Sequence, residues 1–111
     1  MSKFVLVYYN GGDPSKTSKE EMEQIMADWG KWYQELGSAV VDGGNPFGPG
    51  GQEVTAEGVS DIGGPENWHS SGYTIVEADD MAAAVKMAQS NPMHKHTDGK
   101  AVVRVYEAMP M

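Results

Sequence analysis

The chain has 111 residues, enough for one compact domain with a modest core, and we expect a single domain over residues 1–111. Its formal net charge is −8 and it has no block of lysine or arginine, so nucleic acids and anionic membranes are poor partners. The absence of cysteine excludes disulfides, thiolate metal sites and cysteine nucleophiles, and it agrees with the cytoplasmic location that we expect. No apolar run is long enough to span a bilayer, and the first residues lack a signal-peptide pattern.

The first part of the chain predicts a strand followed by a helix. The run KFVLVYYN (Lys3–Asn10) is rich in β-branched and aromatic residues, which is typical of a strand. Ser18 and Glu21 form a capping box that starts a helix, and Gly37 is placed to end it. The apolar residues of this helix recur every three or four positions, as expected for one buried face: Met22, Ile25, Met26, Trp29, Trp32, Tyr33 and Leu36.

The rest of the chain predicts three further strands, a hairpin and a second helix. SAVVDGG is a short strand, the Gly- and Pro-rich segment Gly43–Gly51 is a loop, and QEVTAEGVSDIG predicts a weak hairpin around Glu57-Gly58. SGYTIVEADD is a strand, after which Asp79 or Asp80 caps a helix over Met81–Ser90. Asn91-Pro92 ends that helix, so NPMHKHTDGK is expected to be a loop before the last strand, GKAVVRVYEA.

This order of elements predicts an α+β fold of the ferredoxin-like, split βαβ kind. One antiparallel sheet would carry two helices on one face. The other face would be neither fully polar nor fully apolar, because one row of the last two strands carries Tyr73, Ile75, Glu77, Val102, Arg104 and Tyr106. We therefore expect two copies to pack these faces together as a homodimer that closes a barrel, while exposed amphipathic strands are the alternative.

Several segments together resemble the YCII-related (DGPF-type) family over nearly the whole chain. They are FVLVYYN, MADWGKWYQELG, VVDGGNPFGP, GYTIVEADDMAAAVKMAQSNP and VVRVYEAMP. The resemblance implies a dimeric α+β barrel with a cavity between sheet and helices, and for some relatives a lyase or dehalogenating activity built on a His–Asp pair. The enzyme-like relatives carry this histidine on the first helix. The first helix of this chain has no histidine, and Trp29 lies near the corresponding position. DIGGPENW (Asp61–Trp68) is the nearest counterpart of the DGPF tetrapeptide.

The three histidines and one strand-end carboxylate are the candidates for chemistry. His94 and His96 form an H-x-H pair, but four ligands are needed for a structural zinc site, and a solvated loop is the simpler interpretation, so we expect no metal. Histidine titrates near neutrality, and His69 or His94 paired with Asp42 would suit general acid–base catalysis. Exposed histidines and a turn-forming aspartate are the alternative.

The aromatic residues suggest a pocket for a small, aromatic or anionic metabolite. The expected ligand-binding residues are Tyr9, Trp29, Trp32, Tyr73 and Arg104. Two functions remain open: a dimeric module that binds such a metabolite, or a cofactor-independent lyase or isomerase that moves a proton with a loop histidine and a carboxylate. The missing helix histidine favours binding, and whether the protein is an enzyme is left open.

Overall fold

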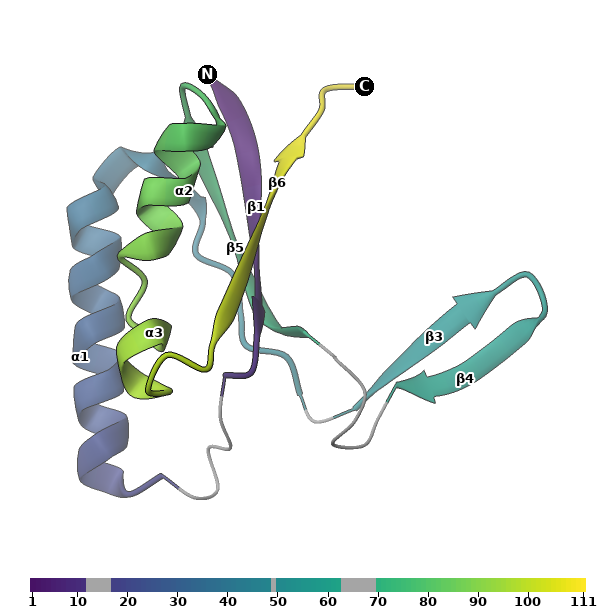
Figure 1. Ribbon diagram of the computed structural model, residues 1–111, viewed down its shortest axis with the longest axis horizontal. Coiled ribbons are helices and arrows are strands. Elements are labelled where there is room, and N and C mark those ends of the chain that lie inside the picture. Colours follow the sequence, from purple (N-terminus) through teal and green to yellow (C-terminus); the bar gives the residue numbers. More distant parts are fainter. Residues whose placement is uncertain (12–16, 49, 63–69) are drawn as a thin grey trace.

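The computed structural model describes residues 1–11, 17–48, 50–62 and 70–111 of the chain. It is an α+β structure in which the helices pack on a four-stranded antiparallel sheet, an arrangement compatible with the predicted ferredoxin-like fold (Figure 1). Among these described residues, no helix has the length and apolar character that a bilayer crossing requires.

The sheet contains β1 (Ser2–Tyr9), β2 (Val40–Asp42), β5 (Ser70–Ala78) and β6 (Val102–Ala108), in the order β2-β5-β1-β6. Each neighbouring pair is antiparallel, and β1 is central, with its Val5 opposite both Ile75 of β5 and Tyr106 of β6. This order places β1 and β5 side by side in the middle, as the predicted split βαβ arrangement requires.

The long helix α1 (Lys19–Leu36) begins as predicted, with the hydroxyl of Ser18 accepting a hydrogen bond from the amide of Glu21 at 3.1 Å. The reciprocal bond differs from the capping box, because the carboxylate of Glu21 accepts from the Ser18 hydroxyl instead of its amide. Gly37 ends the helix with a φ of 57° and opens the short helix η2 (Gly37–Ala39).

The second half of the chain holds α2 (Met81–Gln89), which is capped by the carboxylate of Asp80 as predicted. The expected loop after it is partly wrong, because α3 (Met93–His96) forms one further helical turn. The side-chain oxygen of Asn91 accepts from the amide of Met93 at 2.9 Å, and the helical φ of Pro92 suits the start of a helix. Asn91-Pro92 therefore ends one helix and starts another.

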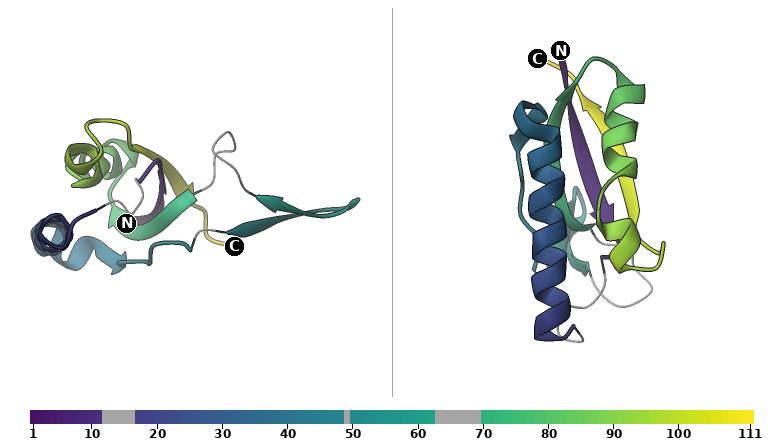
Figure 2. Two further views of the ribbon diagram at one scale, coloured as in Figure 1. Left: turned by 90° about the horizontal axis from the view of Figure 1, so that it is seen from below. Right: turned by 90° about the vertical axis from the view of Figure 1, so that its left-hand side faces the viewer.

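The two faces of the sheet alternate as predicted. The buried side chains that face the helices come from β1 and β5: Phe4, Leu6, Tyr8, Thr74, Val76 and Ala78. Figure 2 shows all three α-helices on this side of the sheet. The opposite rows are only half-buried or exposed, and they include Val5, Val7, Tyr73, Ile75, Arg104 and Tyr106.

The predicted hairpin is present as β3 (Gly51–Thr55) and β4 (Gly58–Ile62), but its turn is at Ala56-Glu57, one residue before the predicted position. It projects away from the sheet on the side opposite the helices (Figures 1 and 2). All of its strand residues except Ile62 are exposed. We call Gly51–Ile62 the arm.

Candidate functional site

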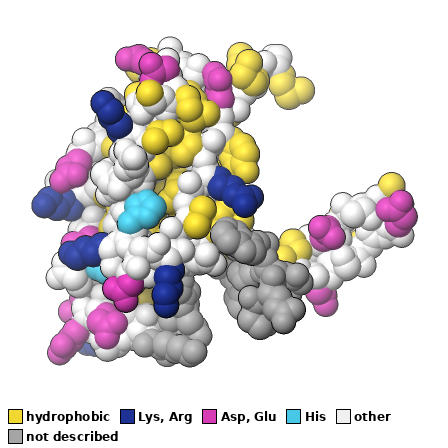
Figure 3. Space-filling model, viewed as in Figure 1, with side chains coloured by type: hydrophobic (Ala, Val, Ile, Leu, Met, Phe, Trp, Pro, Cys, Tyr) yellow, Lys and Arg dark blue, Asp and Glu magenta, His cyan; other side chains and the backbone are white. Residues whose placement is uncertain are grey.

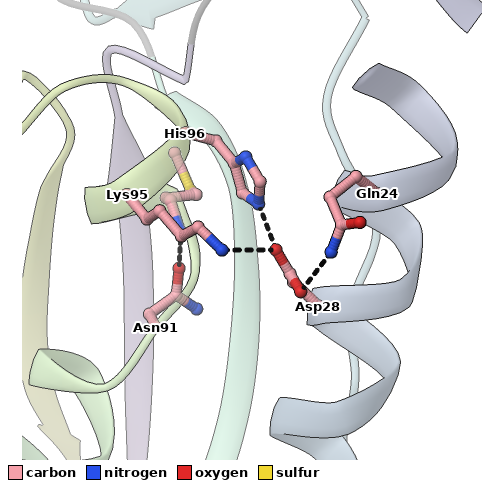
Figure 4. A network of polar contacts seen from close by, with 6 residues as sticks. Gln24, Asp28, Asn91, Lys95 and His96 are labelled. Carbon is pink, nitrogen blue, oxygen red and sulfur yellow. Dashed lines mark hydrogen bonds and ion pairs between the residues drawn. The ribbon is translucent and has the colours of Figure 1, made fainter. Parts of the chain in front are cut away.

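A histidine–carboxylate pair joins α1 to α3. The Nε2 atom of His96 lies 2.7 Å from Oδ2 of Asp28, and both side chains are largely buried, with 17% and 21% of their surface exposed. Asp28 also accepts hydrogen bonds from the ammonium group of Lys95 at 3.4 Å and from the side-chain amide of Gln24, one turn earlier in α1, at 2.9 Å (Figure 4). Three donors thus converge on one carboxylate.

The protonation of the pair follows from this geometry. The hydrogen bond from His96 is the largest of the effects that lower the pKa of Asp28, so the carboxylate is ionised at neutral pH and can only accept. The Nε2 atom of His96 must then carry a hydrogen, so in a neutral ring the unprotonated nitrogen would be Nδ1. Within the described residues Nδ1 makes no hydrogen bond.

Local hydrogen bonds fix the backbone that carries His96. The hydroxyl of Thr97 donates to the carbonyl of Met93 at 2.7 Å and accepts from the amide of Ala101 at 2.8 Å. The amide of Gly99 donates a hydrogen bond to the carbonyl of His94 at 2.8 Å and so caps the end of α3. The imidazole of His96 is therefore held between a capped turn and a charged partner.

The side chain of His96 forms part of the wall of an open hollow of about 710 Å³. The other described lining residues are Asn10, Thr97, Asp98 and Lys100. Asn10 and Asp98 have φ values of 59° and 52°, the left-handed conformation that side chains rarely adopt outside turns. The side chain of Asn10 donates to the carbonyl of Lys100 at 3.3 Å, so β1 and the start of β6 are tied together at the hollow. Its volume falls within the range of small-molecule sites.

A smaller hollow of about 340 Å³ lies on the Asp28 side of the pair. Its lining includes Asp28, Trp32, Asn91 and His94. The indole of Trp32 and the side chain of Asn91 already have protein partners there, and His94, like His96 in the larger hollow, has one ring nitrogen without a hydrogen bond among the described residues. The larger hollow is the candidate site because its histidine is bonded to a carboxylate, whereas His94 is bonded to a backbone carbonyl.

Of the predicted catalytic residues, the structure describes His94 and Asp42. His69 lies outside the described residues. The Nε2 atom of His94 donates to the carbonyl of Ala88 at 3.1 Å, and Oδ1 of Asp42 accepts from the amide of Gly44 at 2.8 Å. In the described part of the chain no hydrogen bond or ion pair joins His94 to Asp42.

The predicted ligand-binding residues lie on both sides of the sheet. Trp29 and Trp32 pack on the helix side, with ring centroids 5.5 Å apart, and Trp32 is 2% exposed. Tyr9, Tyr73 and Arg104 lie on the open face, where the guanidinium of Arg104 stands 4.8 Å from the centre of the Tyr9 ring. One chain therefore does not bring these five residues around one cavity.

A second polar network is buried between sheet and helices. The hydroxyl of Tyr8 donates to Thr74 at 2.6 Å and accepts from the side chain of Asn91 at 3.4 Å. The hydroxyls of Thr74 and Tyr33 both donate to the carbonyl of Gly43, at 3.1 and 2.9 Å. Burial raises the pKa of Tyr8 well above its ordinary value, so the phenol stays neutral and serves as a structural hydrogen-bonding group.

Sequence reasoning missed the partner of His96 and most of the hollow. Asp28 belongs to the polar side of α1 in the sequence pattern, and His96 stands out only as half of an H-x-H pair. Because residues 93–96 are helical, His94 and His96 bond to different elements instead of converging. Across the described ranges, no group of three or more His, Asp or Glu side chains is placed to hold a metal ion.

Comparison with models of known protein families gave no match, and no curated protein is significantly similar to the chain.

Proposed function

We propose that the chain binds a small polar metabolite in the larger hollow and that His96 exchanges a proton with it. The observation that carries this proposal is the 2.7 Å contact of His96 with Asp28 at the wall of that hollow. Asp28 fixes the tautomer and the ring orientation, and Nδ1 then acts as a general base. The reaction class is the lyase or isomerase chemistry that starts with removal of a proton next to a carbonyl.

The remaining lining residues suit a polar, charged substrate. Lys100 offers an ammonium group for an anion, and the side-chain oxygen of Asn10 offers an acceptor, because the hydrogen bond of Asn10 to the Lys100 carbonyl uses its amide nitrogen. These groups come from the end of β1 and from the turn before β6, so both central and edge strands position them. A small carboxylic acid or lactone fits this set better than a purely apolar molecule.

Deuterium exchange can test the proposal before the substrate is identified. A panel of keto acids and lactones is incubated with the protein in D₂O, and exchange next to the carbonyl is followed by NMR. We expect His96→Gln to reduce any catalysed exchange by about 10²- to 10⁴-fold. His94→Gln is the matched control, because His94 bonds to the Ala88 carbonyl, and it should retain activity. Equal exchange rates for His96→Gln and the unsubstituted protein would contradict the role of His96.

A binding module without catalysis is the second candidate. The absence of a histidine from α1, where the resemblance to the YCII-related family implies one for enzyme-like relatives, favours it. In that case a panel member would shift the NMR signals of Asn10, His96 and Lys100 but would not exchange hydrogen. Binding that survives His96→Gln without proton exchange would select this function.

We also propose that two copies pack their open sheet faces together, as the resemblance to the YCII-related family implies. Half-buried Val5 lies opposite half-buried Ile75 of β5 and exposed Tyr106 of β6, and half-buried Val7 lies two residues further along the same face of β1. This apolar group supports an interface there. Such a dimer would also gather Tyr9, Tyr73 and Arg104 of both copies in one region. Analytical ultracentrifugation tests it: Val7→Asp should dissociate the dimer, and a monomer at high concentration would exclude it.

A further inference from the structure

The arm is a hairpin that carries an exposed pair of apolar side chains, and no other described element packs against that pair. Val54 and Val59 lie directly opposite each other across the two strands and are 75% and 62% exposed. An isolated two-stranded hairpin is only marginally stable in water, so a partner that covered this exposed apolar pair would stabilise the arm.

The direction of the arm identifies where that partner lies. In both Figure 1 and the left view of Figure 2, the arm extends beyond the sheet on the side away from α1 and α2. This is the side on which the open sheet face is exposed, so a second copy docked on that face would stand next to the arm.

The area of the open face supports the same conclusion. Four strands spaced about 4.8 Å apart, with about seven residues at 3.3 Å each, cover roughly 400 Å². A stable interface buries about 800 Å² of accessible surface on each partner, so surface beyond this flat footprint would add to an interface here. The arm is a further exposed surface on the same side, and it carries the exposed apolar side chains of Val54 and Val59.

Charge and backbone chemistry select the docking position. Residues 51–62 contain Glu53, Glu57 and Asp61 and no basic residue, and Figure 3 shows acidic but no basic side chains along the arm. On the open face, β6 carries exposed Arg104 between Val102 and Tyr106. Among the described residues, β6 is the last strand of the sheet and pairs with β1 alone, so its other edge can accept a further strand.

We propose that the arm of each copy docks along β6 of a second copy, with Val54 and Val59 against its open face. This inference rests on the dimer proposed above and adds the segment that holds the two copies together. The arms would be exchanged between copies, which places apolar residues against apolar residues and the acidic side chains near Arg104.

Photocrosslinking from a single cysteine tests this docking, because the natural chain has no other thiol. Val59→Cys is labelled with benzophenone maleimide, and isotopically labelled and unlabelled chains are mixed before irradiation. We expect mixed-isotope dimers with the crosslink in the peptide that contains Val102–Ala108. The matched control is Lys19→Cys, which places the label at the start of α1 on the opposite side and should give no crosslinked dimer.

Sedimentation of Val54→Thr/Val59→Thr provides the second measurement. These substitutions keep the branched shape that favours strands but replace two methyl groups by hydroxyls, so the dimer dissociation constant should rise roughly tenfold or more. A dimer whose affinity is unchanged, or whose crosslinks fall within one chain, would overturn arm exchange and leave the sheet-face dimer standing. A chain that sediments as a monomer would overturn both.

Discussion

The carboxylate of Asp28 in α1 and the imidazole of His96 in α3 meet at 2.7 Å, although 68 positions separate them in the sequence. The contact ties the long helix to the turn that precedes the last strand. It therefore links the stability of the fold to the orientation of the proposed catalytic group, and the two effects can be measured separately.

Asp28→Asn is expected to lower the free energy of unfolding near neutral pH. The hydrogen bond from His96 lowers the pKa of Asp28 in the folded chain, so its contribution is complete above the ordinary carboxyl pKa of about 3.9 and disappears as the pH falls through the lower, folded value. Urea unfolding of both proteins between pH 2 and pH 7 checks this. The difference between them should shrink with acidification; a difference that stays constant down to pH 2 would show that the charge of Asp28 is not responsible.

Trp32→Phe is expected to destabilise the chain by about 1–3 kcal/mol, because it removes a buried donor and part of a core side chain. The indole nitrogen of Trp32 donates to the hydroxyl of Ser90 at 3.0 Å and to the carbonyl of Met87 at 3.2 Å. Trp29→Phe is the control, since the indole nitrogen of Trp29 makes no hydrogen bond within the described residues and the residue is less buried. With the slope of the unfolding curve unchanged, Trp32→Phe should lower the urea midpoint more than Trp29→Phe does.

The sequence predicted the sheet, the two main helices and the sides on which side chains lie, because these depend on local periodicity. Alternation in Phe4, Leu6 and Tyr8 and the three-and-four spacing of α1 persist in the structure. The caps at Ser18 and Asp80 also depend on neighbouring residues only, which is why they were predicted.

The candidate site was not predicted because it depends on how distant elements dock. The period of α1 places Asp28 beside the apolar stripe but does not say which element covers it. The sequence pattern indicates a helix end at Pro92, but the fixed φ of proline also favours a helix start, and the resulting turn of α3 carries His96 toward α1. The separation of Trp29 from Tyr73 by the sheet likewise appears only when the layers are assembled.

Two glycines of the chain should respond to alanine in opposite ways. A β-carbon at Gly44 would lie 1.6 Å from the carbonyl oxygen of Tyr73, and φ there is 75°, so Gly44→Ala should cost about 3 kcal/mol or more. Gly30 lies in the middle of α1 with nothing within 4 Å of such a carbon, so Gly30→Ala should stabilise the chain by about 1 kcal/mol. Thermal unfolding of both variants checks the pair. A destabilised Gly30→Ala would indicate a partner on that side of α1.

The buried contact between Tyr8 and Thr74 should appear as an energetic coupling. Tyr8→Phe leaves the side chain of Asn91 without its acceptor, and Thr74→Val removes both the acceptor of Tyr8 and the donor to Gly43, so each should cost about 1–3 kcal/mol. The double variant should cost less than the sum of the two, because the same 2.6 Å hydrogen bond is lost in both. Strict additivity in urea unfolding would mean that the two hydroxyls act independently.

The same tyrosine should make the fold sensitive to alkali. Burial raises the pKa of Tyr8, so the folded chain keeps the phenol proton at a pH where the unfolded chain, with a tyrosine pKa of about 10, releases it. The stabilising contribution of Tyr8 is thus complete below about pH 10 and decreases as the pH rises above that value. Burial also raises the pKa of Tyr33. Tyr33 is present in both the unsubstituted protein and Tyr8→Phe, so its contribution to the pH dependence of stability is shared by the two curves. Unfolding measured from pH 8 to 11.5 should therefore show a steeper loss for the unsubstituted protein, and parallel curves would mean that the Tyr8 hydroxyl reaches solvent.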